Sequence, residues 1–176
     1  MDGARFANAI VRLGMTPAQI TWQSGVDVLS FGITKVGALA AEAVVFFDPP
    51  RAAFMAERRK RAGHLLSKHR FLAAQFAAML ADDMWLTLAR HANLMADKLS
   101  AKLAAVGLAS VWPVETNLVF IVLPCALDAK LKAAGVHYYG RRTTNLKVGA
   151  GQTLARLVTS FATQEDEIER FVQLCK

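Results

Sequence analysis

A lysine inside a glycine-flanked turn is the residue of this sequence with the clearest capacity for chemistry. Lys35 follows the apolar, β-prone run VDVLSF at 26–31 and stands within the segment GITKVG. A strand that ends in such a turn presents its last residues at the carboxyl edge of a sheet, where α/β proteins form ligand sites. An amine partly desolvated there has a lowered pKa and can attack a carbonyl carbon. The spacing alone still favours an ordinary exposed loop lysine.

A second candidate is Asp2, in the opening segment MDGAR. An aspartate between a strand and a helix can face the protonated ring nitrogen of a bound cofactor and keep that ring electron-withdrawing. Aspartate is also a preferred N-cap of helices, and for Asp2 taken alone the cap is the favoured interpretation.

The composition predicts a packed and soluble protein. Of the 176 residues, 54% are hydrophobic and 20% are charged, which indicates a folded core rather than disorder. The formal net charge of +7 favours anionic partners without choosing among them. Cys125 and Cys175 are too far apart in sequence to indicate a disulfide framework. The start has no signal-peptide pattern and no segment reaches membrane-spanning length, so we expect a cytoplasmic protein without a membrane segment.

Hydrophobic periodicity and turn residues divide the chain into alternating elements. The long stretch 51–106 is helical in pattern, with breaks expected at Gly63 and at 81–83. Thr16 with the proline after it resembles a helix start. We expect further helices at 4–13, 125–135 and 164–174, strands at 26–31, 41–47 (buried on both faces) and 116–123, and short strand candidates at 136–140, 145–150 and 156–162.

The boundary between two parts of the chain is expected between 106 and 116, where the long helices give way to short elements. The two strands of the first part do not make an independently stable sheet. We therefore expect strands that pair with them to be supplied by chain upstream.

Several segments together resemble one family. DGAR, the run DVLSFGITK about thirty residues later, AEAVVFF, RRKRAGHLLSKHRFLAAQ and TLARLVTSFAT occur in the order found in the low-specificity L-threonine aldolase and β-eliminating lyase family, within the fold-type-I pyridoxal-phosphate (PLP) enzymes. The resemblance implies an α/β fold: the C-terminal part of a PLP-dependent transferase large domain over 1–106, followed by a small α+β C-terminal domain over 107–176. It also implies an upstream half that carries the phosphate-binding loop.

The resemblance assigns roles to four residues. Lys35 matches the lysine that binds PLP, and Asp2 matches the aspartate that pairs with the pyridine nitrogen. Arg5 matches the arginine beside the cofactor's ring oxygen. Arg156 matches the arginine that holds the substrate carboxylate, a task that suits the bidentate guanidinium.

The implied reaction is retro-aldol cleavage of L-threonine or L-allo-threonine to glycine and an aldehyde, by a homodimer or homotetramer. Two alternatives stay open within the resemblance: a PLP-dependent β-eliminating lyase, and an inactive remnant that serves as an interaction module. A nucleic-acid-binding protein centred on RRKR at 58–61 is disfavoured, because no aromatic residues are interleaved for stacking. No set of histidine, cysteine and acidic residues has metal-ligand spacing, so we expect no metal.

The turn around Lys35 departs from the family's pattern. Ile33 stands where the family has glycine or alanine, and Val36 stands where it has asparagine. Because β-branched residues resist positive φ, these two would strain the turn if it required that conformation.

Overall fold

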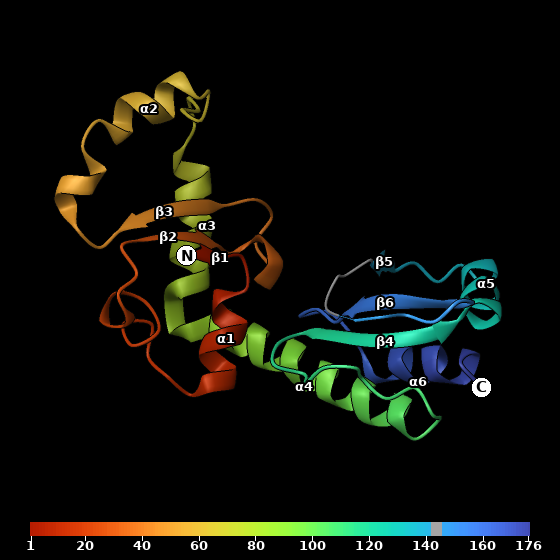
Figure 1. The fold of residues 1–176 in the computed structure, drawn as a ribbon. Helices are drawn as coiled ribbons and strands as arrows, with labels where there is room; N and C mark the ends of the chain where they lie inside the picture. The colour runs from red at the N-terminus through yellow and green to blue at the C-terminus, as the bar shows by residue number, and fades with distance from the viewer. Residues whose placement is uncertain (142–145) are drawn as a thin grey trace. The chain divides into compact units, whose positions relative to one another are not determined.

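The computed structural model describes residues 1–141 and 146–176, which form two compact units, Met1–Ala89 and Arg90–Lys176 (Figure 1). Each unit has a three-stranded sheet and a hydrophobic core of its own. The division into domains at 1–106 and 107–176 stays a prediction, because compact units of this chain and domains of a longer protein need not coincide.

The sheet of the first unit is formed by strands from about the first half of its sequence. Its strands are β1 (Asp2–Gly3), β2 (Val28–Gly32) and β3 (Glu42–Phe46), in the order β1-β2-β3. β1 runs parallel to β2, and β3 runs antiparallel to it. The strands predicted at 26–31 and 41–47 are therefore confirmed, whereas a two-residue strand such as β1 carries no periodicity that could predict it.

The two faces of this sheet differ in burial. Leu29 and Phe31 point into the core. Ser30 and Val44, which pair across β2 and β3, point outward from the opposite face of the sheet. Val44 is 57% exposed, so the prediction that 41–47 is buried on both faces is wrong for this chain. The apolar helix residues of this unit pack on the Leu29 and Phe31 side only, and strand residues alternate between the faces.

Aromatic packing holds the helices of the first unit on the covered face. The rings of Phe6 and Phe31 lie 5.6 Å apart between centroids, and those of Phe31 and Trp85 lie 5.3 Å apart, both near edge-to-face. Such pairs stabilise beyond their buried area by about 0.5–1.5 kcal/mol each. The helices that supply the core are α1 (Phe6–Leu13), α3 (Arg70–Leu80) and the first turns of α4 (Met84–Ala104).

The stretch 51–106, predicted to be helical, contains three α-helices: α2 (Met55–Arg61), α3 and α4. Both predicted breaks are confirmed. Gly63 adopts a φ of +76°, and Asp82 and Asp83 adopt φ values of 51° and 52°. Left-handed backbone stops a right-handed helix, and aspartate is among the few residues besides glycine that tolerate it. Short 3₁₀ turns complete the unit: η1 (Trp22–Ser24), η2 (Thr34–Val36), η3 (Pro49–Ala52) and η4 (Ala81–Asp83).

The predicted helix start at Thr16 is wrong, because a cap forms there without a helix. The Thr16 N–H donates to Gln19 Oε1 at 2.8 Å, and the Gln19 N–H donates to Thr16 Oγ1 at 3.3 Å. The chain then forms turns and η1, since the hydroxyls of Thr21 and Ser24 donate to backbone carbonyls that a helix would use. Hydroxyl-to-backbone bonds of this kind compete with helix formation.

The second unit is built on the antiparallel sheet β4-β6-β5. Its strands are β4 (Leu118–Pro124), β5 (Tyr139–Arg141) and β6 (Gln152–Val158). They confirm the strand expected at 116–123. The strands expected at 136–140 and 156–162 are confirmed only in part, because β5 begins at Tyr139 and β6 runs from Gln152 to Val158. The candidate at 145–150 begins at Asn145, which lies outside the described residues; 146–150 contains no strand, so that part of the prediction is wrong.

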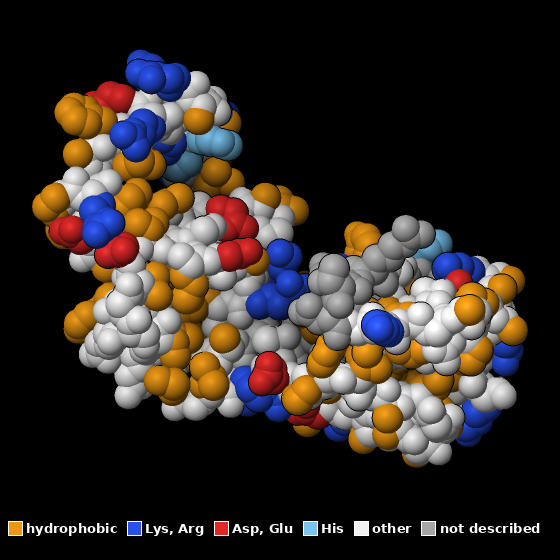
Figure 2. All heavy atoms as spheres, in the orientation of Figure 1, with side chains coloured by type: hydrophobic (Ala, Val, Ile, Leu, Met, Phe, Trp, Pro, Cys, Tyr) orange, Lys and Arg blue, Asp and Glu red, His pale blue; other side chains and the backbone are white. Residues whose placement is uncertain are grey.

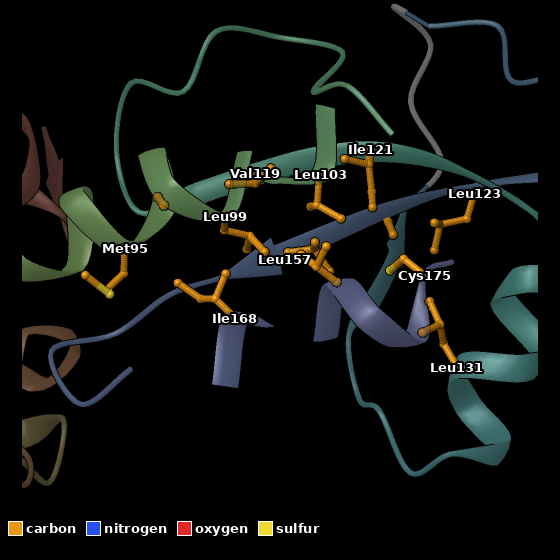
Figure 3. Packing of buried hydrophobic residues seen from close by; sticks show 13 residues of the cluster. Met95, Leu99, Leu103, Val119, Ile121, Leu123, Leu131, Leu157, Ile168 and Cys175 are labelled. Carbon is orange, nitrogen blue, oxygen red and sulfur yellow. The ribbon is translucent and has the colours of Figure 1, made fainter. Parts of the chain in front are cut away.

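One face of this sheet forms the core of the second unit (Figure 3). Val119, Ile121 and Leu123 of β4 are completely buried, and α4 and α6 (Glu165–Leu174) lie on the same side of the sheet (Figure 1). Leu103 and Ile168 bring those helices into the cluster. Since each fully buried Leu or Ile contributes about 1.5–3 kcal/mol, this packing stabilises the sheet that contains β6.

Local signals in the sequence set both short helices of this unit. α6 begins with a capping box, in which the Gln164 N–H donates to Glu167 Oε2 at 2.8 Å. Lys98 and Lys102 of α4 form ion pairs with Glu165 and Glu169 of α6, which fix the register between the two helices. α5 (Cys125–Ala133) is followed by Gly135 at a φ of +81°. The helices predicted at 125–135 and 164–174 are confirmed.

Asp128 ties α5 to the segment that enters β5. The Tyr138 hydroxyl donates to Asp128 Oδ1 at 2.6 Å, and Lys132 Nζ donates to Oδ2 at 2.7 Å. These bonds hold the pKa of Asp128 below its usual value, with the Lys132 bond the larger cause. Burial, followed by the Asp128 bond, raises the pKa of Tyr138. The carboxylate is therefore charged, with a donor on each oxygen.

We expect Asp128→Asn to lower the free energy of unfolding at pH 7 by about 1–2 kcal/mol, because charge-assisted hydrogen bonds become neutral ones. Since the folded pKa lies below the unfolded value of about 3.9, the wild-type advantage is complete above about pH 5 and disappears as pH falls through the folded pKa. Urea unfolding at pH 7 and pH 3 measures both effects. Asp166→Asn, in an ion pair whose side chains are 70% and 71% exposed, is the control and should change little. An equal deficit of the Asp128 variant at both pH values would contradict the assignment.

Within the described residues, no helix combines the length and apolar character needed to cross a membrane.

Candidate functional site

Lys35 lies just beyond the carboxyl end of β2, and Asp2 begins the parallel strand β1 that pairs with β2. Asp2 pairs with Ser30 and Gly3 with Phe31 in a parallel register. Parallel strands end at the same edge, so the residues that follow β1 and β2 lie beside one another there. Lys35 comes three residues after the last residue of β2, within η2. The predicted placement of the lysine at a carboxyl sheet edge is confirmed.

Gly3 lets β1 approach β2 closely enough to place Asp2. A Cβ at this position would lie 2.4 Å from the Ser30 carbonyl oxygen and 2.6 Å from Leu29 Cδ1. Asp2 itself is exposed, on the open face of the sheet beside Ser30, and its Oδ1 accepts the Ala4 N–H at 2.9 Å. The aspartate is thus oriented by a turn rather than capping a helix; the N-cap of α1 is Arg5.

We expect Gly3→Ala to lower the free energy of unfolding by about 1–3 kcal/mol, since the added methyl group forces β1 away from β2. Thermal or urea unfolding measures this loss. Gly140→Ala is a matched control, because its Cβ would meet only Thr153 Cγ2 at an ordinary 3.7 Å. Equal stability of the two alanine variants would mean that the close approach of β1 and β2 is unnecessary.

The turn that carries Lys35 is anchored on both sides of the lysine. Ile33 is completely buried and Val36 is 3% exposed, whereas Lys35 between them is exposed. The Ile33 N–H donates to the Ala41 carbonyl at 3.2 Å, and the Ala41 N–H donates to Thr34 Oγ1 at 3.2 Å. A hydrogen-bonded turn with buried flanks therefore presents an exposed amine beyond the end of β2.

The two departures from the family's pattern leave this turn unstrained. Ile33 has a φ of −111°, and the non-glycine residues with positive φ in the described chain are Phe54, Asp82 and Asp83. Ile33 and Val36 instead contribute apolar surface to the core of the first unit. The turn therefore lacks the backbone strain that the sequence suggested, because Ile33 and Val36 both adopt ordinary backbone conformations.

Arg5 lies three residues after Asp2, at the N-cap of α1, and is half-buried. Its backbone carbonyl accepts the Ala9 N–H at 3.1 Å, which fixes the start of the helix. Asp2, within β1, Arg5, just after β1, and Lys35, just after β2, all belong to the first unit. A carboxylate, a guanidinium and an amine in these places suit an anionic cofactor with a basic ring nitrogen and an aldehyde, as PLP has.

Arg156 belongs to the second unit, where it lines a cavity of about 750 Å³. Its neighbours Ala155 and Leu157 point into the core, so the Arg156 side chain points from the opposite face of the sheet. The Nε atom of Arg156 is buried and has no hydrogen-bond partner among the described residues. A buried donor without a partner is costly, and an oxygen of a bound carboxylate would satisfy it. The geometry therefore suits the predicted role of Arg156.

The cavity has a mixed lining that the sequence did not predict. His137, Tyr139, Thr159 and Glu167 line it together with apolar residues of α4, β6 and α6. Glu167 is already engaged by the capping box of α6, so its carboxylate serves the helix N-terminus. In the sequence, only the two adjacent tyrosines of VHYYG could have drawn attention to Tyr139. Whether Tyr139 lies near Arg156 depends on the register in which the strands pair.

The basic run 58–61 forms α2, which has no buried residue (Figure 2). It is a solvated helix, as the sequence favoured. Among the described residues, no group of three histidine, cysteine or acidic side chains could hold a metal ion.

Comparison with known proteins agrees with this arrangement. The model of the beta-eliminating lyase family matches residues 1–126. A low-specificity L-threonine aldolase of Pseudomonas aeruginosa is 42% identical over 177 aligned residues, which cover 100% of this chain and 48% of that protein. One from a Pseudomonas species is 41% identical, with 96% of this chain and 46% of that protein covered. The chain spans about half the length of these curated relatives.

Solved structures give the same result for the fold. A threonine aldolase of Leishmania major matches 99% of this chain and 49% of its own, with a TM-score of 0.87 at 32% identity. A serine palmitoyltransferase of Sphingomonas wittichii matches 87% of this chain and 39% of its own, with a TM-score of 0.60 at 16% identity, which shows the shared fold alone. The predicted α/β fold, corresponding to part of a fold-type-I PLP enzyme, is confirmed. The chain belongs to the low-specificity L-threonine aldolase and β-eliminating lyase family.

Proposed function

We propose that the protein to which this chain contributes cleaves L-threonine, L-allo-threonine and related β-hydroxy-α-amino acids to glycine and an aldehyde, with PLP as cofactor. The observation that carries the proposal is the parallel pairing of β1, which contains Asp2, with β2, whose carboxyl end leads into the turn that carries Lys35. The identity of 42% to a protein named as a low-specificity L-threonine aldolase supports the choice of reaction.

Each candidate residue has a task that its position allows. Bound PLP supplies an electron sink for the pair released when the Cα–Cβ bond breaks. The Lys35 amine would hold the cofactor through its aldehyde group until substrate binds. The Asp2 carboxylate would keep a proton on the ring nitrogen, and Arg5 would interact with the ring oxygen. Arg156 donates hydrogen bonds to the substrate carboxylate and so orients the substrate.

A hybrid chain tests the proposal, because the relatives are about twice as long as this chain. The upstream half of the Pseudomonas aeruginosa relative would be fused to Met1 and the hybrid supplied with PLP and L-allo-threonine. We expect equimolar glycine and acetaldehyde. A 2-ketoacid with ammonia would indicate β-elimination instead, and the absence of all products from a folded hybrid that retains PLP would favour an inactive remnant.

We also propose that the protein self-associates. Apolar side chains of the first unit are exposed along the segment from α2 to α3: Phe54 at 74%, Leu65 at 48%, Leu66 at 54% and Phe71 at 59%. Exposed apolar residues gathered on one segment are typical of interfaces. Light scattering on the hybrid should give the mass of a dimer or tetramer, and a monomer at micromolar concentration would contradict this.

A further inference from the structure

Strand register places an aromatic ring directly against the candidate substrate arginine. β5 pairs antiparallel with β6, and Tyr139 lies opposite Arg156. Side chains of directly opposed residues leave the same face of a sheet and contact one another. The guanidinium carbon of Arg156 lies 4.8 Å from the centroid of the Tyr139 ring, within the range of an attractive cation–π contact.

This contact holds the guanidinium without occupying its donors. An aspartate or glutamate in the same place would neutralise the charge and accept the N–H groups that a carboxylate ligand needs. Among the described residues, no acidic side chain forms an ion pair with Arg156, and its Nε has no hydrogen-bond partner. A ring face attracts the cation through its quadrupole and accepts none of those hydrogen bonds in the guanidinium plane.

The backbone on either side of Tyr139 is itself anchored, although the ring is 68% exposed. The Tyr138 hydroxyl donates to Asp128, and the Val136 N–H donates to the Leu131 carbonyl at 3.0 Å. On the other side, the pairing of Gly140 with Ala155 continues the strand. The ring therefore starts from a fixed backbone position beside the cavity.

We propose that Tyr139 is a positioning residue, which stacks on the Arg156 guanidinium and holds it oriented over the cavity with its N–H groups available to a carboxylate. The inference rests on the proposed function, since it assumes that Arg156 binds the substrate carboxylate. It assigns to the β5 segment a part in substrate affinity that the resemblance did not imply.

The test uses this chain labelled with ¹⁵N-arginine, and sodium acetate as the carboxylate probe. The Arg156 Nε–H signal is identified by its absence from Arg156→Lys. Tyr139→Leu keeps an apolar side chain at this position but removes the aromatic ring. We expect it to shift the Arg156 Nε–H signal of the acetate-free protein, because the ring current is lost. It should also weaken acetate binding about two- to five-fold, the equivalent of one exposed cation–π contact. Tyr139→Phe keeps the ring and should restore both the signal position and the affinity.

Controls separate positioning from general disturbance. Trp22→Leu removes an aromatic ring that is 54% exposed in the first unit, and it should leave the Arg156 signal unchanged. The remaining arginine signals report whether each variant is folded, and Tyr139→Ile replaces Tyr139→Leu if the latter unfolds.

Two results would overturn the inference and are distinguishable. If Tyr139→Leu leaves the Arg156 signal and the acetate affinity as in the wild type while acetate still binds, Tyr139 has no positioning role and the carboxylate site stands. If acetate perturbs the Arg156 signal in no protein, including the wild type, Arg156 is not a carboxylate site. The assignment of the substrate arginine then fails, and the role of Tyr139 fails with it.

Discussion

Lys35→Ala should lower the release of acetaldehyde from L-allo-threonine by at least about a thousand-fold in the hybrid enzyme, because no other group would hold the cofactor covalently at the sheet edge. The structure presents this amine from a turn anchored by buried Ile33 and Val36, so its removal should leave the fold intact. Coupled reduction of the aldehyde, followed by loss of NADH absorbance, measures the rate.

A covalent trap identifies the lysine independently of turnover. Borohydride reduction in the presence of PLP should fix the cofactor on Lys35, where peptide mass spectrometry can locate it. Lys102→Ala removes a lysine of an exposed ion pair on α4 and is the control that should keep both rate and adduct. An adduct mainly on another lysine, or full activity of Lys35→Ala, would remove the central assignment.

Arg156→Lys should reduce kcat/KM for L-allo-threonine by about 10–100-fold, with most of the change in KM. Lysine keeps the positive charge but lacks the planar fork that donates two parallel hydrogen bonds to a carboxylate. The loss of one charge-assisted bond corresponds to about 1.5–3 kcal/mol. Because the carboxylate is held alike before and during the reaction, the contact contributes uniform binding and its loss raises KM. Initial rates over a range of substrate concentrations separate KM from kcat.

The matched control for this change is Arg170→Lys, in an ion pair on α6 whose side chains are 71% and 70% exposed. It should leave both kinetic constants unchanged. A variant of Arg156 that loses kcat with KM unaltered would indicate that this arginine acts on the reacting bond and not on the substrate carboxylate.

Elements with strong local signals were predictable from the sequence. The capping box at Gln164 and the positive φ at Gly63 and Gly135 depend on residues within a few positions of one another. The strand that leads to Lys35 was recognisable for the same reason. The candidate site residues were recognised from the order of several motifs. Taken singly, Lys35 is more simply explained as an exposed loop lysine and Asp2 as a helix cap.

Competing local hydrogen bonds and distant packing partners were not predictable. A helix was expected to begin at Thr16, but the chain forms turns there, and the Thr21 hydroxyl donates to the Pro17 carbonyl. Val44 belongs to a run apolar enough to be buried on both faces, yet its exposure depends on which face the helices cover. Asp82 and Asp83 marked a break without revealing that both adopt left-handed backbone.

The sequence by itself determined the family, most of the helices and strands, and the residue types available for chemistry, because these follow from short-range patterns and motif order. The tertiary structure alone decided which residues meet. β1 pairs with a strand that begins twenty-five residues after it ends, which sets Asp2 beside Ser30 on the strand that leads to Lys35. β5 and β6 meet in the register that sets Tyr139 against Arg156. Both contacts are long-range pairings whose register depends on packing of the whole unit, and local propensity carries no information about register.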